Sequence, residues 1–345
     1  MSYMLTETRE QPDWVERAIE SERGNASRLA AVMRERDIRF VIIAARGTSD
    51  NAATYAKYLF EIVAGLPVAL AAPSVYTLYD ARMRMENTLV MGISQSGQGT
   101  DVVQVLSSAR SAGALTACIT NYPDSPLAHV SDEVFLCHAG EEKSVAATKT
   151  YTTALAVVAL IVSMLADRRD LLDSLCHVPA RMKAALAVEE IVAQSVERYR
   201  YMQECAVLSR GVNQATALEA ALKMTETSYV VAKPYSGADF LHGPIAMVAA
   251  GFPCFLYAPE GRAFPSLLEL ALKVKDRQGE LLVVSTAPEI LELATVPIKL
   301  PTVIDELLSP LAYILPGQLF AYYLAKVRGG DPDAPRGLTK VTLTR

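Results

Sequence analysis

Three charged residues spaced for one helix face offer acid–base chemistry in the segment Gln214–Val231, which is expected to be helical. Glu219, Lys223 and Glu226 stand at positions i, i+4 and i+7, so a helix would group their side chains. Two carboxylates beside an amine can supply a general base tuned by a neighbouring charge. The alternative is a solvated face on which glutamate and lysine simply pair. By helical spacing, the residues expected to face the core are Leu218, Ala221, Leu222, Thr225 and Tyr229.

A histidine in a turn-rich segment follows this helix. His242 lies next to Gly243 and Pro244, and an imidazole changes its charge near neutral pH. It could therefore move protons, or it could be an ordinary loop residue. The remaining histidines have no motif around them and are expected to be structural: His129, His138 and His177.

Two turns rich in hydroxyl groups follow predicted strands in the first half of the chain, at Ala45–Asn51 and Ser94–Thr100. Free backbone amides at the helix starts would favour an anion there, and neutral hydroxyls can donate to phosphate oxygens. Neither turn is a Walker loop or a dinucleotide-binding loop. The alternative is ordinary capping by serine and threonine. The candidate ligand residues are Thr48, Ser49, Ser94, Gln95, Ser96 and Thr100.

Two further segments carry candidate residues. Thr148 and Lys149 begin a long apolar segment, where Lys149 could either present its amine to a site or be solvated. The C-terminal stretch from Asp331 onward is rich in proline and glycine, which predicts a tail that frays.

These motifs lie between short apolar runs that alternate with helical patterns. Because several runs are apolar at every position, they indicate parallel strands covered on both faces. The sequence predicts an α/β fold with two doubly wound parallel sheets in tandem, joined by a helical hairpin at Thr148–Ala166 and Pro179–Gln203. The expected strands are Phe40–Ala44, Val68–Ala71, Leu89–Ile93, Leu115–Ile119, Val134–Leu136, Ala206–Leu208, Cys254–Tyr257, Leu281–Val284 and Ile298–Leu300. The other expected helices are Ala52–Val63, Val102–Ala112, Ser266–Asp276 and Leu311–Arg328, the last with a possible kink at Pro316.

Length, charge and cysteine content limit the classes of function to be considered. The chain has 345 residues, enough for about two domains, and a net charge of -5 with no basic cluster, which argues against nucleic-acid and anionic-membrane partners. Its five scattered cysteines suit neither a zinc knuckle nor a redox pair and fit a reducing compartment. The N-terminus lacks a signal-peptide pattern, and the most apolar stretch, Ala154–Leu165, is too short to span a membrane. A cytoplasmic enzyme is therefore expected.

Several motifs together resemble one family. The run Ser209–Met247 is similar to the isomerase half of glucosamine-6-phosphate synthase, and so are four shorter segments in the same order. The resemblance identifies the chain as a member of the double sugar-isomerase-domain (SIS) family. It implies an N-terminal helical extension at 1–25, SIS domains at 26–166 and 167–330, and an active-site tail at 331–345. The shorter segments are Glu10–Pro12, Ser94–Gly97, Ala147–Lys149 and Asp331–Thr344.

The resemblance also implies a role for each matching residue. Glu226 matches the glutamate that moves a proton between C1 and C2 of the sugar, and Lys223 matches the lysine beside it. His242 matches the ring-opening histidine, which reaches across from the other subunit, and Lys340 matches the tail lysine at the sugar carbonyl. Neither a metal nor a cofactor is implied. The sugar-phosphate cradle is implied to include Ser49, Ser94, Gln95, Ser96, Val145 and Ala147, with Thr48, Thr100 and Glu219 as further substrate-binding candidates.

The chain departs from the family pattern in three places. The glutaminase half and its cysteine nucleophile are expected to be absent. Gln98 and Gly99 displace the hydroxyl of Thr100 by one position, and Leu241 replaces a charged residue before the histidine.

The expected function is therefore an amino-sugar-phosphate isomerase or deaminase that works as a homodimer with shared active sites. Conversion of glucosamine 6-phosphate to fructose 6-phosphate and ammonia is favoured. A fructosamine-6-phosphate deglycase and another ketose–aldose isomerase are the enzymatic alternatives. A sugar-phosphate sensor is the alternative from another class, although no helix-turn-helix segment is evident.

Overall fold

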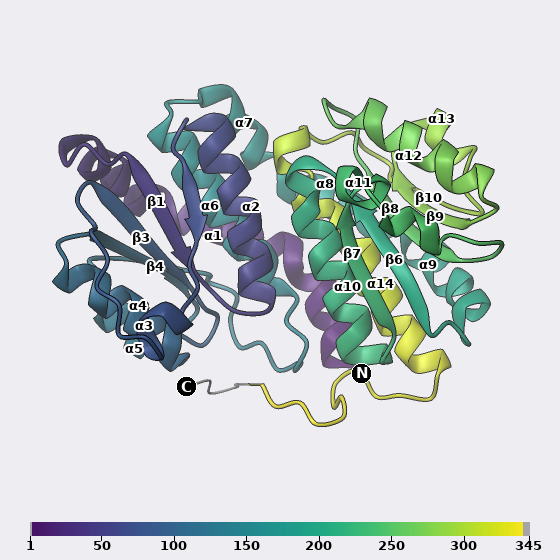
Figure 1. Cartoon of the computed structure of the whole chain (residues 1–345), viewed down its shortest axis with the longest axis horizontal. Helices are drawn as coiled ribbons and strands as arrows, with labels where there is room; N and C mark the ends of the chain where they lie inside the picture. The colour runs from purple at the N-terminus through teal and green to yellow at the C-terminus, as the bar shows by residue number, and fades with distance from the viewer. Residues whose placement is uncertain (1, 341–345) are drawn as a thin grey trace. The chain divides into compact units, whose positions relative to one another are not determined.

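Apolar runs in both halves of the chain form parallel strands in the computed structural model, which describes residues 2–340 (Figure 1). The described residues divide into two units. The N-sheet unit comprises residues 13–142, 149–177 and 339–340, and the C-sheet unit comprises residues 2–12, 143–148 and 178–338. The first helix, α1 (Tyr3–Glu35), contributes residues to both units.

The N-sheet unit contains five parallel strands in the order β2-β1-β3-β4-β5. Ile42 of β1 pairs with Ala69 of β2 and with Val90 of β3. The strands are β1 (Phe40–Ala44), β2 (Val68–Leu70), β3 (Thr88–Ile93), β4 (Leu115–Thr120) and β5 (Glu133–Leu136). Its helices after α1 are α2 (Thr48–Val63), α3 (Ser74–Thr77), α4 (Thr100–Ser111), α5 (Pro126–His129), α6 (Lys149–Leu165) and α7 (Arg169–Cys176).

The C-sheet unit has the order β10-β9-β8-β6-β7, which from the other edge repeats the strand order of the N-sheet unit. Leu208 of β6 pairs with Tyr235 of β7 and with Leu256 of β8. The strands are β6 (Glu204–Ser209), β7 (Val231–Ser236), β8 (Pro253–Ala258), β9 (Glu280–Ser285) and β10 (Val296–Lys299). The α-helices are α8 (Val178–Ala185), α9 (Glu189–Ser195), α10 (Gln214–Ser228), α11 (Gly237–Leu241), α12 (Phe264–Asp276), α13 (Pro288–Leu291) and α14 (Pro310–Val327). The 3-10 turns are η1 (Leu186–Val188), η2 (Val196–Tyr199), η3 (Gly211–Asn213), η4 (Pro244–Met247) and η5 (Glu306–Leu308).

Each sheet has its own apolar core. In the N-sheet unit, β3 and β4 are buried at every position, as expected for strands covered on both faces. Ile42 and Val90 form a cluster with Val105 on α4. In the C-sheet unit, Leu256 clusters with Leu270 on α12. These contacts confirm the predicted class of two doubly wound parallel α/β sheets; the division of the chain at residues 25, 166 and 330 stays a prediction.

Two expected elements are wrong. Helix α10 ends at Ser228, because Tyr229 adopts a left-handed conformation (φ 57°) and β7 begins at Val231, where the sequence pattern continued the helix. The second arm of the predicted hairpin, Pro179–Gln203, is not one helix but a series of short pieces. Pro316 lies inside α14, which nevertheless runs without interruption.

Among residues 2–340 we find no helix that is both long and apolar enough to cross a membrane. The same residues contain no cluster of three or more histidine, cysteine or acidic side chains with the spacing of a metal site.

Candidate functional site

The predicted charged face of α10 is a buried ion cluster. The ammonium of Lys223 lies 3.3 Å from Glu219 Oε1 and 2.7 Å from Glu226 Oε2. The side chains of Lys223 and Glu219 are fully buried, whereas that of Glu226 is 25% exposed. The solvated-face interpretation is therefore wrong, although the pairing that it assumed is present.

The predicted core face of α10 was also wrong in part. Ala221 is buried, but Thr225 is exposed and Leu222 is only half-buried. Helix α10 packs against α14, where the hydroxyl groups of Thr227 and Ser228 both donate to the carbonyl of Ala321. Gly317 of α14 permits this approach, since a Cβ atom there would lie 3.0 Å from Cβ of Ala220.

The two neighbouring carboxylates determine the charge state of Lys223. Burial alone would lower the pKa of Lys223, but the two adjacent carboxylates outweigh this effect and raise the pKa above its ordinary value. Lys223 therefore remains an ammonium across the neutral range. Glu226 is the member of the cluster that reaches solvent, so its carboxylate is the one placed to exchange a proton with a ligand.

His242 lies in the same unit as this cluster and is exposed to solvent. Its backbone amide donates to the carbonyl of Asp239 at 3.1 Å, which closes the short helix α11. Leu241, which departs from the family pattern, packs against the apolar cluster of the C-sheet unit that contains Leu256 and Leu270.

The two hydroxyl-rich turns lie in the N-sheet unit, at the carboxyl ends of the neighbouring strands β1 and β3. The alternative in which serine and threonine side chains cap the following helices is wrong for α2 and α4. The N-cap positions of these helices are occupied by Gly47 and Gly99. Ser94 Oγ and Ser96 Oγ instead accept backbone N–H groups within their own turn, each at 3.2 Å. An accepting hydroxyl keeps its own hydrogen for donation, so these serines are suited to an anion.

The turn after β3 is unusually tight. Gly97 has a φ of 61°, and a Cβ atom at this position would lie 2.3 Å from Ser125 Oγ. Only glycine fits both constraints. The turn therefore presents Ser94, Gln95 and Ser96 as half-buried residues at the strand end.

An ion pair that the sequence analysis missed connects the two turns. Arg46 Nε donates to Asp101 Oδ2 at 2.7 Å, and the Asp101 side chain is 2% exposed at the start of α4. A lone carboxylate at that point would repel an anion, and Arg46 offsets it. The sequence signal for this pair was the positive charge of Arg46 in the first hydroxyl-rich turn. Its partner, Asp101, lies 55 residues away, so the spacing gave no sign of the contact.

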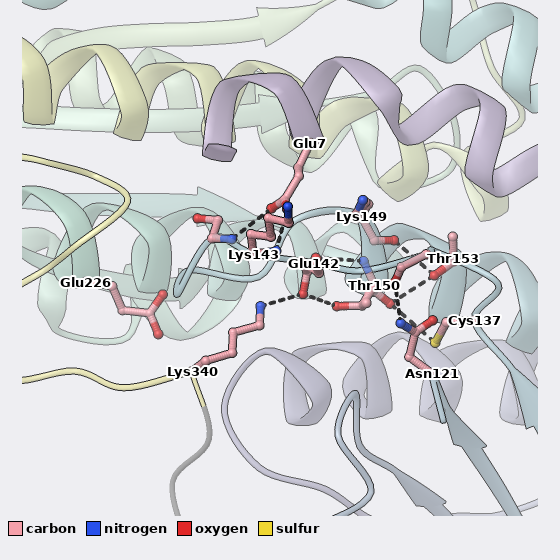
Figure 2. Close-up of polar contacts among 12 residues, drawn as sticks. Glu7, Asn121, Cys137, Glu142, Lys143, Lys149, Thr150, Thr153, Glu226 and Lys340 are labelled. Carbon is pink, nitrogen blue, oxygen red and sulfur yellow. Dashed lines mark hydrogen bonds and ion pairs between the residues drawn. The ribbon is translucent and has the colours of Figure 1, made fainter. Parts of the chain in front are cut away.

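The loop before α6 contains Val145 and Ala147, both half-buried in the C-sheet unit. Its backbone is fixed by Glu7, whose carboxylate accepts from the amide of Lys143 at 2.5 Å and from that of Ser144 at 3.2 Å (Figure 2). Glu7 is 4% exposed and was also missed by sequence reasoning, because nothing near it in the chain signals this contact.

Lys149 lies at the start of α6 in the N-sheet unit and is 3% exposed. Its ammonium is 5.1 Å from the centre of the Trp14 ring, a cation–π distance. The interpretation of Lys149 as a solvated residue is therefore wrong.

The tail is ordered as far as the structure describes it. Asp333 accepts from the backbone amides of Tyr3 and Met4 at the start of α1, and the Arg336 guanidinium lies 3.9 Å from the centre of the Tyr229 ring. The expected fraying is wrong for these residues because charged contacts hold them. The last part of the tail motif, 341–344, lies outside the described residues.

Lys340 ends the described tail and belongs to the N-sheet unit. Its ammonium lies 2.8 Å from Glu142 Oε2, and the Glu142 side chain is fully buried (Figure 2). Glu142 is a further residue that the sequence analysis did not identify.

The structure thus groups the candidates within each unit. The C-sheet unit brings Glu219, Lys223 and Glu226 into one cluster and also holds Val145, Ala147 and His242. The N-sheet unit holds the other candidates: Thr48, Ser49, Ser94, Gln95, Ser96, Thr100 and Lys340.

Comparisons with known proteins match this architecture. The SIS domain family matches residues 36–164 and 204–328, more than half of the chain. The glutamine–fructose-6-phosphate aminotransferase (isomerizing) of Thermococcus kodakarensis is 34% identical over 348 aligned residues, covering 98% of this chain and 57% of the relative. The chain therefore spans little more than half the length of that relative.

Solved structures match over nearly all of the chain. A candidate phosphosugar isomerase from Silicibacter pomeroyi DSS-3 is 34% identical, with a TM-score of 0.87, covering 96% of this chain and 100% of that one. The C-terminal domain of a glucosamine–fructose-6-phosphate aminotransferase from Francisella tularensis is 27% identical, with a TM-score of 0.86 and coverage of 97% and 98%. A glucosamine-6-phosphate deaminase from Thermotoga maritima, 21% identical with a TM-score of 0.80 and coverage of 99% and 100%, shares the fold.

Proposed function

Since this chain belongs to the SIS domain family and is homologous to the isomerase half of glutamine–fructose-6-phosphate aminotransferase, we propose that it is a phosphosugar isomerase acting on an amino sugar. The specific reaction we propose is deamination of glucosamine 6-phosphate to fructose 6-phosphate and ammonia. The observation that carries this proposal is the buried Glu219–Lys223–Glu226 cluster, in which one carboxylate reaches solvent.

Binding of the phosphate is assigned to the turns that contain Ser49 and Ser96. Both turns combine hydroxyl groups with the start of a helix, where free amides and the helix dipole favour an anion. The Arg46–Asp101 pair supports this assignment, because it offsets the negative charge at the start of α4.

Proton transfer is assigned to Glu226. In the proposed mechanism His242 assists opening of the pyranose ring, and the Glu226 carboxylate then removes the proton from C2 of the open-chain sugar. Delivery of a proton to C1 gives a 2-imino sugar, and water hydrolyses the imine to fructose 6-phosphate and ammonia. The ammonium groups of Lys223 and Lys340 offset the negative charge that develops on the enediol-like intermediate.

An ammonia-release assay tests this function. The purified chain is mixed with a panel of hexosamine 6-phosphates and fructosamine 6-phosphates, and ammonia and the ketose phosphate are both quantified. We expect equal amounts of the two products from glucosamine 6-phosphate. Release only from a fructosamine 6-phosphate would instead identify a deglycase, and binding without turnover across the panel would indicate a sensor.

We further propose that two copies share their active sites, with His242 of one copy serving the other. The exposure of His242 at the surface supports this arrangement. Mixing His242→Ala chains with Glu226→Gln chains should restore part of the activity, because each mixed dimer can assemble one intact site. If no activity returns after verified subunit exchange, each site is made within a single chain.

A further inference from the structure

Glu142 is a buried carboxylate whose partners come from two distant segments of the N-sheet unit. Oε1 accepts the backbone N–H of Thr150 at 3.0 Å, and Oε2 accepts the Thr150 hydroxyl at 2.8 Å. Oε2 also accepts from the Lys340 ammonium at 2.8 Å, across 198 residues of sequence (Figure 2). The carboxylate therefore joins the start of α6 to the end of the described tail.

The surroundings of Glu142 satisfy its carboxylate and fix its position. Thr150 lies in the first turn of α6, whose 17 residues place the positive end of a helix dipole beside the carboxylate. The Glu142 side chain is fully buried, whereas that of Lys340 is 25% exposed. A buried carboxylate needs both hydrogen bonds and a counter-charge. Thr150 supplies the hydrogen bonds and Lys340 supplies the counter-charge.

We propose that Glu142 is a positioning residue that holds the Lys340 amine in its working place and so keeps the tail ordered. The part that concerns catalysis rests on the proposed function, in which Lys340 lies at the sugar carbonyl; the part that concerns the tail does not. Glu142 acts through Lys340 and touches no reacting atom.

Glu142→Gln separates this role from a purely structural one. The glutamine carbonyl can still accept the Thr150 N–H, and its amide can donate to the Thr150 hydroxyl, which accepts as well as donates. The amide that replaces Oε2, however, cannot accept from the Lys340 ammonium. The substitution therefore spares the contacts with α6 and removes the contact with the tail. Glu141→Gln is the matched control, because Glu141 is the adjacent, exposed glutamate.

The first experiment is a double-mutant cycle in kcat/KM for ammonia release, with Glu142→Gln, Lys340→Met and the double variant. Loss of positioning in Glu142→Gln should lower kcat/KM by about 10²-fold. The double variant should be no worse than Lys340→Met, since a residue that acts through Lys340 has nothing left to position. The proposal would be overturned if the losses of the two single variants multiply in the double variant, or if Glu142→Gln turns over normally.

The second experiment needs no activity. Trypsin can cut after Lys340 only when its side chain leaves Glu142 and enters the protease, whereas the bond after Arg336 serves as an internal reference. Intact-mass measurements should show cleavage after Lys340 accelerated about tenfold in Glu142→Gln, the size expected for one charge-assisted hydrogen bond. Glu141→Gln should match the wild type.

The two experiments also distinguish two kinds of failure. If the wild-type chain releases no ammonia but Glu142→Gln still exposes Lys340, the proposed function fails and the role of Glu142 in holding the tail stands. If the cleavage rates of Glu142→Gln and the wild type are equal in the folded proteins, Glu142 does not hold the tail, whatever the chain catalyses.

Discussion

The two sheets have the same strand order, yet the turns at corresponding positions are used differently. In the N-sheet unit, the turn between β3 and α4 carries Ser94 and Ser96. In the C-sheet unit, the turn between β8 and α12 is filled by the unit's own Glu306. That carboxylate accepts the backbone amides of Arg262 at 2.7 Å and Ala263 at 3.0 Å.

In the proposed function, this difference lets one topology yield one ligand site from two similar positions. A strand-to-helix turn in a parallel sheet gathers backbone amides that favour an anion. The C-sheet unit satisfies these amides internally with Glu306. The N-sheet unit instead lines its turn with hydroxyl groups, and there we place the substrate phosphate.

The helices that follow the first strand of each sheet differ as well. Helix α2 begins with Thr48 and Ser49 and carries no buried ion cluster, whereas α10 buries Glu219 and Lys223. In the proposed function, the N-sheet unit therefore contributes recognition of the phosphate and the C-sheet unit contributes proton transfer. Each prediction below tests one side of this comparison.

The largest effect is expected from Lys223→Met, which leaves Glu219 buried without its cation. Breaking a buried ion pair costs about 3–5 kcal/mol of unfolding free energy, measured by urea denaturation. Lys273→Met on α12 is the control, because its pair with Glu269 is exposed and contributes under about 1 kcal/mol. Equal losses in the two variants would contradict the difference in burial.

The pH dependence of this stability has a definite sign. The pKa of Lys223 is raised above 10.5, so its contribution is fully present below that pH and is lost only as the pH rises through the higher folded-state value. In the neutral range the difference in stability between the wild type and Lys223→Met should therefore not change with pH through this group.

The next effect concerns Glu226→Gln, which keeps the size of the side chain and removes the proposed base. We expect kcat to fall by about 10²-fold or more with little change in KM. Exchange of the C2 hydrogen in deuterated water should be lost in parallel. Thr225→Ser, at the exposed neighbouring position, is the control. Near-normal turnover in folded Glu226→Gln would remove this residue from the mechanism.

Ser96→Ala and Ser49→Ala test the phosphate assignment. Each removes a hydroxyl donor to a charged group, a contribution of about 1.5–3 kcal/mol, so KM for the phosphorylated sugar should rise by about tenfold or more. Unfolding free energies should change little. If KM is unchanged in both variants, the phosphate binds elsewhere.

The smallest effect is expected from Glu306→Ala. In contrast to the serine variants, it should lower stability and leave KM unchanged. It leaves the amides of Arg262 and Ala263 without their carboxylate, at a cost of about 1 kcal/mol of stability at this exposed turn. KM for the sugar phosphate should not change. A raised KM in Glu306→Ala would mean that the turn in the C-sheet unit also serves the substrate.

The sequence by itself determined most of the strand positions and the grouping of the charged residues on α10. All-apolar runs specify strands buried on both faces, and helical spacing makes Glu219, Lys223 and Glu226 neighbours whatever surrounds them. The strand β7 was missed because the pattern of α10 continues through Val231, and the left-handed Tyr229 that ends the helix has no signal in the spacing.

Only the tertiary structure decided which charges are buried and which distant groups pair. The charged face of α10 would suit a solvated surface by its spacing alone, yet in the folded chain Glu219 and Lys223 are fully buried. The pairs Glu142–Lys340 and Glu7–Lys143 join residues 198 and 136 positions apart. Local spacing constrains neighbours within one helix, because the helix itself fixes their separation. Contacts across so much sequence depend on how the sheets and helices pack, so no short motif encodes them.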